Sequence, residues 1–201
     1  LHCFCENDGV NRYDALGQDP KSELINGARN SWLMFSKYYF GMYKRWPISA
    51  LFLNLAVDGA KRSGAIPYGY DSQVSTAIKK SREYKEKIAD LIRMASPGFN
   101  HLHNDSSSIE FLSGDLYAAI KLAQFSYDGY ICKRRSGDAK VKLDIVVSDK
   151  YDFRWWSLKD TKLSGWDQFF YMVGNNMAYI DQELGAIVPF DWNAKIKESR
   201  K

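Results

Sequence analysis

The 201-residue sequence predicts an α+β fold: a helical N-terminal two-thirds, followed by an antiparallel β-hairpin or small sheet and a C-terminal helix. Apolar residues recur at helical spacing in four stretches between residues 19 and 122. In residues 140–147, by contrast, apolar side chains occupy every second position, as they do in a half-buried strand. Helices that precede a hairpin in this way are typical of an α+β domain.

The individual elements follow from their boundary residues. Pro47 suits the first turn of a helix, Ser72 is a favoured N-cap residue, and Gly185 suits a helix C-terminus. We therefore expect helices over 20–46, 48–59, 72–95, 116–122 and 165–184, and strands over 125–134, 140–147 and 187–192. Residues 65–70 are expected to be a turn-rich connection, and the segment from Asn193 onward a polar tail.

Composition narrows the function classes. The apolar fraction of 45% allows a folded core, and the aromatic fraction of 15% suits either that core or a surface that holds a ligand or lipid. The net charge of +4 does not by itself indicate nucleic-acid binding. Three cysteines without repeated spacing predict neither a disulfide framework nor a zinc site. The longest apolar run, residues 48–57, is too short to predict a transmembrane segment.

The first seventeen residues, LHCFCENDGVNRYDALG, are typical of a strand followed by turns rich in Asn and Gly. They resemble the end of the core of rearrangement-hotspot (RHS) repeat proteins, where an aromatic strand leads into Asn-Asn-Pro-(Val/Ile)-Asn and then Asp-Pro-Leu-Gly. The matching residues are Phe4, Asn7, Val10, Asn11, Asp14, Leu16 and Gly17. The sequence departs from this pattern at Asp8, at Gly9 and at Ala15, which replaces a proline beside the site where such proteins release their C-terminal toxin.

This resemblance implies that residues 1–18 end an RHS core or linker and that residues 19–201 form a C-terminal effector domain. Such tails are commonly secreted toxins, enclosed in the RHS shell and neutralised in the producing cell by an immunity protein. The start at Leu1 agrees with a fragment of a longer protein.

The densest cluster of reactive side chains follows the predicted hairpin. Asp149 and Asp152 are three residues apart with Tyr151 between them, and a turn at Lys150 would bring both carboxylates together. Paired carboxylates can hold Mg²⁺ or Ca²⁺, or one can take up a proton while the other stays charged. The residues also allow a structural interpretation, with a capping aspartate, a core tyrosine and a surface aspartate.

A hairpin that leads into Asp-x-Tyr-Asp-Phe, here residues 149–153, resembles the catalytic segment of colicin M and related toxins. Those toxins use a divalent cation to hydrolyse the lipid-linked peptidoglycan precursor between its undecaprenyl chain and the pyrophosphate. The resemblance implies a phosphodiesterase-like hydrolase that acts on a lipid-linked substrate in the periplasm of a target cell. It assigns catalysis to Asp149, Tyr151 and Asp152, and the metal to Asp149 and Asp152.

Two further residues are candidates for substrate binding, Arg154 and Lys159. The family places a His-Arg pair six and seven residues after its second aspartate, where this chain has Leu158 and Lys159. Lys159 keeps a positive charge without the bidentate geometry of arginine, but Leu158 supplies no acid or base.

His101 and His103 are therefore candidates for the missing acid or base. A His-x-His sequence in a strand places both rings on one face, where they can act as a base or bind a metal. We hypothesise that one of them folds next to Asp152. The alternative is a polar, exposed loop.

Two other functions stay open from the sequence. A nuclease toxin would use a basic helix face together with His101 or His103; that face consists of Lys79, Lys80, Arg82, Lys85 and Lys87. The third candidate is a non-catalytic RHS tail. The basic residues 133–135 at the predicted hairpin tip can contact phosphates or simply form a solvated turn.

Overall fold

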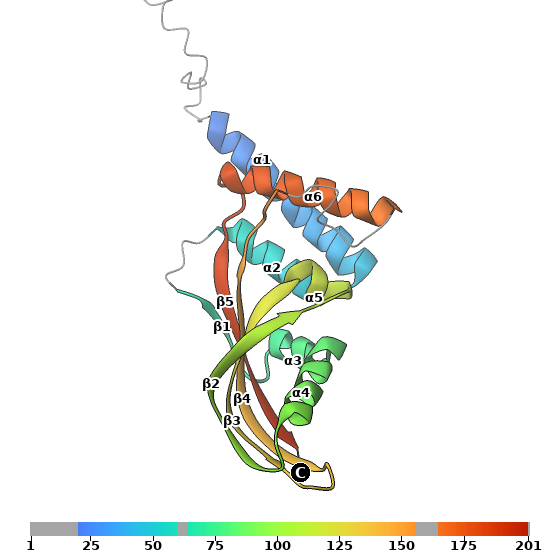
Figure 1. Ribbon diagram of the computed structural model, residues 1–201. Helices are drawn as coiled ribbons and strands as arrows, with labels where there is room; N and C mark the ends of the chain where they lie inside the picture. Colours follow the sequence, from blue (N-terminus) through green and yellow to red (C-terminus); the bar gives the residue numbers. More distant parts are fainter. Residues whose placement is uncertain (1–19, 60–63, 156–164, 201) are drawn as a thin grey trace, which may run out of the picture.

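The computed structural model describes residues 20–59, 64–155 and 165–200, and it has the predicted α+β architecture (Figure 1). In chain order the elements are α1 (Pro20–Phe35), η1 (Ser36–Lys44), α2 (Pro47–Asp58), β1 (Ile66–Tyr68), α3 (Gln73–Lys80), α4 (Arg82–Met94), β2 (Gly98–Glu110), α5 (Gly114–Ala119), β3 (Leu122–Lys133), β4 (Ala139–Tyr151), α6 (Gly165–Glu183) and β5 (Phe190–Arg200). Of these, η1 is a π-helix that continues α1. None of the helices within the described residues is long and apolar enough to cross a bilayer.

The five strands form one sheet in the order β1-β5-β4-β3-β2, with β1 parallel to β5 and every other pair antiparallel. The alternation predicted for residues 140–147 is confirmed. On β4, the side chains of Val141, Leu143, Ile145 and Val147 are buried, whereas Lys142 and Asp144 are exposed. One face of the sheet therefore belongs to the core, and the other is open to solvent.

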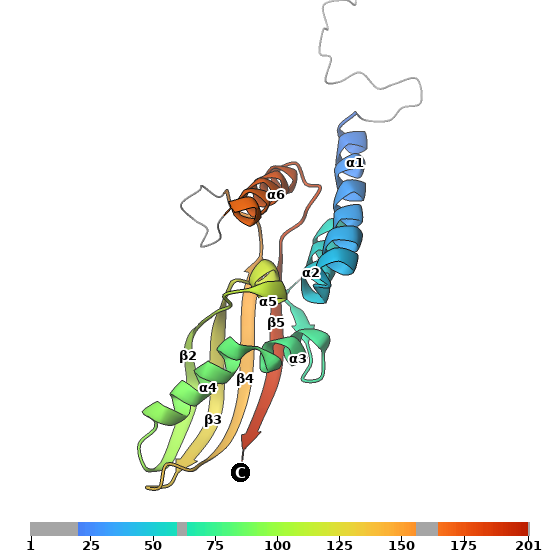
Figure 2. The same cartoon turned by 90° about the vertical axis from the view of Figure 1, so that its right-hand side faces the viewer.

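The helices cover the sheet in two groups. Figure 2 shows α3 and α4 across the core face of the sheet, while α1, α2, α5 and α6 gather near one end of the strands. Asp115 of α5 joins two members of the second group, because its carboxylate accepts hydrogen bonds from the backbone N–H groups of Ile48 and Ser49 at the start of α2. Asp115 thus caps α2 rather than its own helix, and buries an otherwise unpaired helix end.

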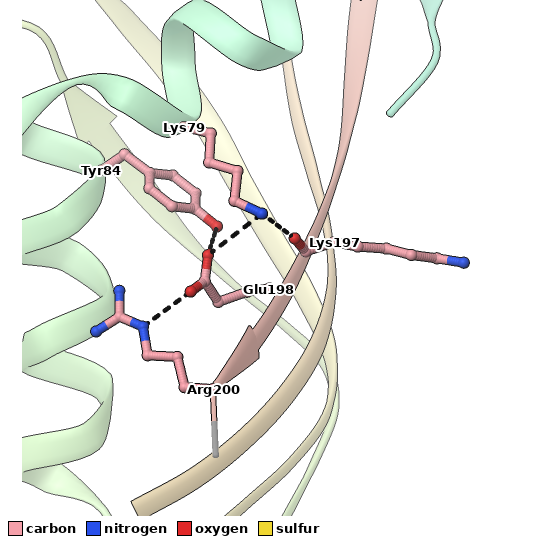
Figure 3. Close-up of polar contacts among 5 residues, drawn as sticks. All are labelled: Lys79, Tyr84, Lys197, Glu198 and Arg200. Carbon is pink, nitrogen blue, oxygen red and sulfur yellow. Dashed lines mark hydrogen bonds and ion pairs between the residues drawn. The ribbon is translucent and has the colours of Figure 1, made fainter. Parts of the chain in front are cut away.

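A polar cluster fixes α3 and α4 to the far end of β5 (Figure 3). The buried carboxylate of Glu198 accepts a hydrogen bond from the Tyr84 hydroxyl at 3.0 Å and pairs with Arg200 at 2.8 Å. Lys79 donates to the backbone carbonyl of Lys197 and lies 4.0 Å from Glu198. Burial, followed by the negative charge of Glu198, strongly raises the pKa of Tyr84, so its hydroxyl keeps the proton that it donates. Tyr84 and Lys79 thereby link α4 and α3 to β5, and the buried charge of Glu198 has partners on three sides.

Several predicted boundaries were wrong. The long helix expected from Ser72 is two helices, interrupted at Ser81, whose side chain caps α4 by accepting from the backbone N–H of Tyr84. The last strand, predicted over 187–192, begins at Phe190 and continues to Arg200, so the segment after Asn193 is part of β5 and not a polar tail. The connection at 65–70 contains the short strand β1.

The largest difference is β2, since the sequence indicated no strand between the helix ending near residue 95 and the hairpin. Among the strands that the structure describes, β2 forms the edge of the sheet and pairs with β3 alone. Of its thirteen residues, Ile109 alone is buried, which is why the segment lacks a clear apolar alternation. The RHS-like leader, residues 1–18, lies outside the described residues.

Candidate functional site

A cavity of about 890 Å³ lies at the helical end of the sheet, where α1, η1, α5 and α6 meet the end of β4. Most of its wall is aromatic or aliphatic. Among the residues that line it are Trp32, Phe35, Tyr39, Phe40, Leu53, Tyr117, Ile120, Phe153, Val173 and Met177. Asp149, Asp152 and Arg154 line the same cavity, so charged groups meet an otherwise apolar surface.

Hydrogen bonds between elements hold the walls of the cavity together. The indole N–H of Trp32 on α1 donates to the carboxylate of Asp181 on α6 at 2.7 Å. Gln182, also on α6, accepts from the backbone N–H of Phe153 at 2.9 Å and donates to its carbonyl at 3.3 Å. Helix α6 is thereby attached both to α1 and to the segment that follows β4, and the cavity lies between these contacts.

The two aspartates border this cavity from consecutive parts of one segment. Asp149 and Tyr151 occupy alternate positions of β4 on the core face, and the strand ends before Asp152. The turn at Lys150 that would bring both carboxylates together is not formed, because β4 continues through this residue. The side chain of Asp152 is 23% exposed, and its carboxylate lies 3.7 Å from the Nε of Arg154.

Asp149 is the acidic group whose ionisation the site changes most. Burial of the carboxyl raises the pKa of Asp149 to about 6; a hydrogen bond from the backbone of Lys150 lowers it, and the charge of Asp152 raises it again. Burial is the largest of these effects, and the charge of Asp152 adds to it. A carboxyl with a pKa of about 6 can exchange protons near neutral pH, as a general base must.

We expect the Asp149→Asn variant to be more stable than the wild type at pH 8 and equally stable at pH 4. The pKa of Asp149 is raised on folding, so the folded state binds the proton more tightly and wild-type stability falls as pH rises from about 4 to about 6. The amide removes that loss, which is about 1–2 kcal/mol after allowance for partial exposure.

Thermal unfolding at both pH values, in a chelating buffer, measures this effect. The matched control is Asp144→Asn, which changes an exposed carboxyl on the opposite face of the same strand and should leave the pH profile unchanged. A variant at Asp149 that unfolds like the wild type at pH 8 would show that the carboxyl is well solvated.

Tyr151 has a packing role that the sequence left open. Its ring contacts Phe52, Phe153 and Phe190 with centroid distances of 5.4, 5.2 and 5.3 Å, and it is buried. Burial raises the pKa of Tyr151 far above neutrality, so the phenol keeps its proton and cannot act as a base. It lines the cavity, where its hydroxyl can at most donate a hydrogen bond or position neighbours.

The hypothesis that His101 or His103 lies next to Asp152 was wrong. In the sheet, His101 pairs with Tyr130, which pairs with Lys142, seven residues before Asp149 on β4. At roughly 3.3 Å per residue, this offset places His101 about 23 Å from Asp149 along the strand direction. Residues aligned across a sheet share a face, so His101 projects from the solvent-facing side, opposite Asp149. His103 instead pairs with Asp128 at 3.1 Å.

The same geometry separates the parts of the predicted nuclease site. Lys79–Lys87 lie on α3 and α4, which cover the core face, whereas His101 projects from the other face. Two of the five basic residues are already in contacts: Lys79 with β5, and Arg82 with Glu86 at 2.7 Å. At the hairpin tip, Lys133 donates to the carbonyls of Arg93 and Ala95 at the end of α4, which is a structural contact.

Asp149 and Asp152 could supply two carboxylate ligands to a divalent cation, and the other ligands would have to be water or substrate. The described residues contain no group of three or more His, Cys, Asp or Glu side chains that could hold a metal ion. Mg²⁺, however, commonly uses one or two carboxylates together with water and substrate phosphate. Asp149 and Asp152 are the residues that would hold such an ion, and its positive charge would favour the ionised form of both carboxyls. Lys159 lies outside the described residues.

The sequence reasoning missed the apolar part of the site. The residues that α1 and η1 contribute to the cavity, Trp32, Phe35 and Tyr39, were interpreted only as the periodic face of a helix. Their spacing was the available signal, because three aromatic side chains on one helical face suit a ligand wall as well as a core.

Comparison with known proteins does not identify the family of this chain. No family model matches the chain, and no curated protein is significantly similar to it. Among solved structures it is similar to PaeM, a colicin M-like bacteriocin produced by Pseudomonas aeruginosa, with 11% sequence identity and a TM-score of 0.44. The match covers 76% of this chain and 51% of the bacteriocin, so the chain spans about half the length of that protein.

Proposed function

We propose that the chain is a toxin effector domain that hydrolyses a lipid-linked phosphoester at Asp149 and Asp152. The observation that carries the proposal is that Asp149 and Asp152 both line one large, mainly apolar cavity. A site that cleaves a phosphoester next to a lipid needs both features, because the phosphate requires charged groups and the lipid requires an apolar wall.

The cavity suits a prenyl chain in size and chemistry. Its volume of about 890 Å³ lies in the upper part of the range of small-molecule pockets. The rings of Trp32, Phe35 and Tyr39 can contact a chain of methyl and methylene groups without leaving polar atoms unpaired. The polar end of the substrate would then lie near Asp152 and Arg154.

The reaction consists of the attack of water on the phosphorus atom next to the lipid. The new P–O bond forms as the bond from phosphorus to the lipid oxygen breaks; Asp149 accepts the proton of the water, and the lipid oxygen is released as an alcohol after it takes up a proton. A cation held by Asp152 would neutralise charge on the phosphate oxygens. Arg154 can contact the same oxygens, since its side chain is 82% exposed and reaches Asp152 loosely.

The biological setting of the proposal comes from the leader. The resemblance of residues 1–17 to the end of an RHS core supports a secreted toxin with a cognate immunity protein and an enclosing RHS shell. Because the colicin M-like reaction takes place on the outer side of the cytoplasmic membrane, delivery to the periplasm is part of the proposal.

Expression of the chain in one compartment at a time tests the proposal. We expect export to the periplasm of a bacterial host to cause lysis, because the lipid-linked precursor is exposed there, and we expect cytoplasmic expression to be tolerated. Growth arrest from the cytoplasm with degraded RNA or DNA would support the nuclease instead. The absence of toxicity in both compartments, with the folded protein present, would support a non-catalytic tail.

A further inference from the structure

The outer face of α1 and η1 carries apolar side chains that no described element covers. Met34, Tyr38, Met42 and Tyr43 are 60%, 51%, 65% and 74% exposed. Together with Lys37 and Lys44 we call these residues the α1–η1 outer surface. Met34, Tyr38 and Met42 follow one another at every fourth position, so they form one row along the helix.

The same segment has a net positive charge, because it lacks acidic residues. Between Glu23 and Asp58 the sequence has no acidic residue and four basic ones: Arg29, Lys37, Lys44 and Arg45. The whole chain has 28 basic and 24 acidic residues, so the remainder carries equal numbers of the two. Residues 24–57 therefore carry a net charge of +4. Lys37 and Lys44 place two of these charges on the α1–η1 outer surface, whereas Arg29 donates to the carbonyls of Gly185 and Ala186.

The lysines lie against the exposed rings. The ammonium of Lys37 is 5.5 Å from the ring centroid of Tyr38, and that of Lys44 is 5.4 Å from the centroid of Tyr43. Tyrosine rings beside lysines are typical of the interface between bilayer headgroups and acyl chains, where the ring is half immersed and the ammonium reaches the phosphates. Cores of protein–protein interfaces, in contrast, are depleted of lysine.

An aromatic row connects this surface with the cavity. The ring of Tyr43 lies 5.9 Å from that of Tyr39, which stacks on Phe35 at 4.8 Å. Phe35 and Tyr39 line the cavity. A membrane that contacts Tyr43 would thus lie one ring away from the wall that the proposed prenyl chain occupies.

We propose that the α1–η1 outer surface docks on a bilayer that contains anionic phospholipid and so brings the cavity to a substrate embedded in that bilayer. The inference deepens the proposed function and rests on it for the purpose of docking. The bilayer contact itself is inferred from the exposed apolar side chains and the lysine charges of this surface, independently of any hydrolysis. It is peripheral, through side chains of Met34, Tyr38, Met42 and Tyr43 and the adjoining lysines.

Sedimentation with vesicles, in the absence of substrate, tests the docking. We expect the purified chain to bind vesicles of phosphatidylglycerol and phosphatidylcholine at least about tenfold more tightly than vesicles of phosphatidylcholine alone. The triple variant Lys37→Glu, Tyr38→Ser and Met42→Ser should lose at least about tenfold in this affinity. None of the three residues lines the cavity.

The matched control makes the same three kinds of change at the opposite end of the sheet: Met94→Ser, Phe99→Ser and Lys140→Glu. Met94 and Phe99 are 75% and 66% exposed, and the control should bind within about twofold of the wild type. Equal binding by the wild type and the α1–η1 triple variant would overturn the inference, as would equal losses in both triple variants. Competition by millimolar inorganic phosphate would also overturn it, because it would indicate a phosphate site rather than a bilayer contact.

The docking and the hydrolysis can fail separately. In detergent micelles, where docking is not needed, the α1–η1 triple variant should hydrolyse the lipid-linked substrate like the wild type. Asp152→Asn should show the opposite behaviour, with normal vesicle binding and hydrolysis lowered by about 10²–10³-fold. Vesicle binding as expected, without hydrolysis by any form of the chain, would overturn the proposed function and leave the docking surface standing.

Discussion

Replacement of Asp152 by asparagine is expected to lower hydrolysis of a lipid-linked diphosphate by about 10²–10³-fold, the usual loss when one charge-stabilising group is removed. The amide has nearly the same shape as the carboxylate but no negative charge to hold a cation. The carboxylate contacts Arg154 loosely, at 3.7 Å, so the change in stability should be below about 0.5 kcal/mol. Turnover in detergent and thermal unfolding, measured side by side, separate the two effects.

The control for this variant is Asp144→Asn, which removes the same charge from the exposed face of β4. It should hydrolyse the substrate like the wild type. Activity of Asp152→Asn within twofold of the wild type would contradict the assigned role.

Replacement of Gly129 by alanine is expected to destabilise the chain by about 3 kcal/mol or more. Gly129 lies in the middle of β3 with φ 138°, a conformation that side chains rarely adopt, and a Cβ built there would meet the backbone oxygen of Lys142 on β4 at 2.2 Å. The obstacle is main chain of a neighbouring strand and cannot rotate away, so the central strand pair must separate. Denaturant unfolding monitored by tryptophan fluorescence measures the loss.

Gly27→Ala is the matched control, because Gly27 lies in α1 with nothing within 4 Å of the added methyl group. Alanine in a helix should stabilise the chain by about 0.5–1 kcal/mol. A Gly129→Ala variant as stable as the wild type would show that β3 and β4 do not pair in this register.

The sequence predicted those elements whose apolar residues face one core. The strand β4 was found because Val141, Leu143, Ile145 and Val147 alternate with exposed residues. The edge strand β2 was missed because its partner lies on one side only and nearly all of its side chains remain in solvent. The second half of β5 was missed because its inward position at Glu198 is charged, and only the contacts with Tyr84 and Arg200 make that burial tolerable.

The sequence could predict which site residues lie close together within one segment. It could not predict which distant segments fold next to that site. Asp149 and Asp152 are three residues apart in one chain segment, and both line the same cavity. The position of His101 depends on the pairing of β2 with β3, which no local pattern encodes, so its expected approach to Asp152 could not be tested from sequence. The apolar cavity likewise depends on how α1 and α6 pack against β4, through contacts such as that of Trp32 with Asp181.

Direct detection of the cleavage products tests the central claim most simply. Purified chain, a detergent-solubilised undecaprenyl diphosphate-linked sugar and Mg²⁺ are incubated, and phosphorus NMR follows the products across a range of pH. The expected result is a free lipid alcohol together with a water-soluble sugar diphosphate, released by the wild-type chain and not by Asp149→Asn. An intact substrate in the presence of folded wild-type chain, or equal release by Asp152→Asn, would contradict hydrolysis at this carboxylate pair.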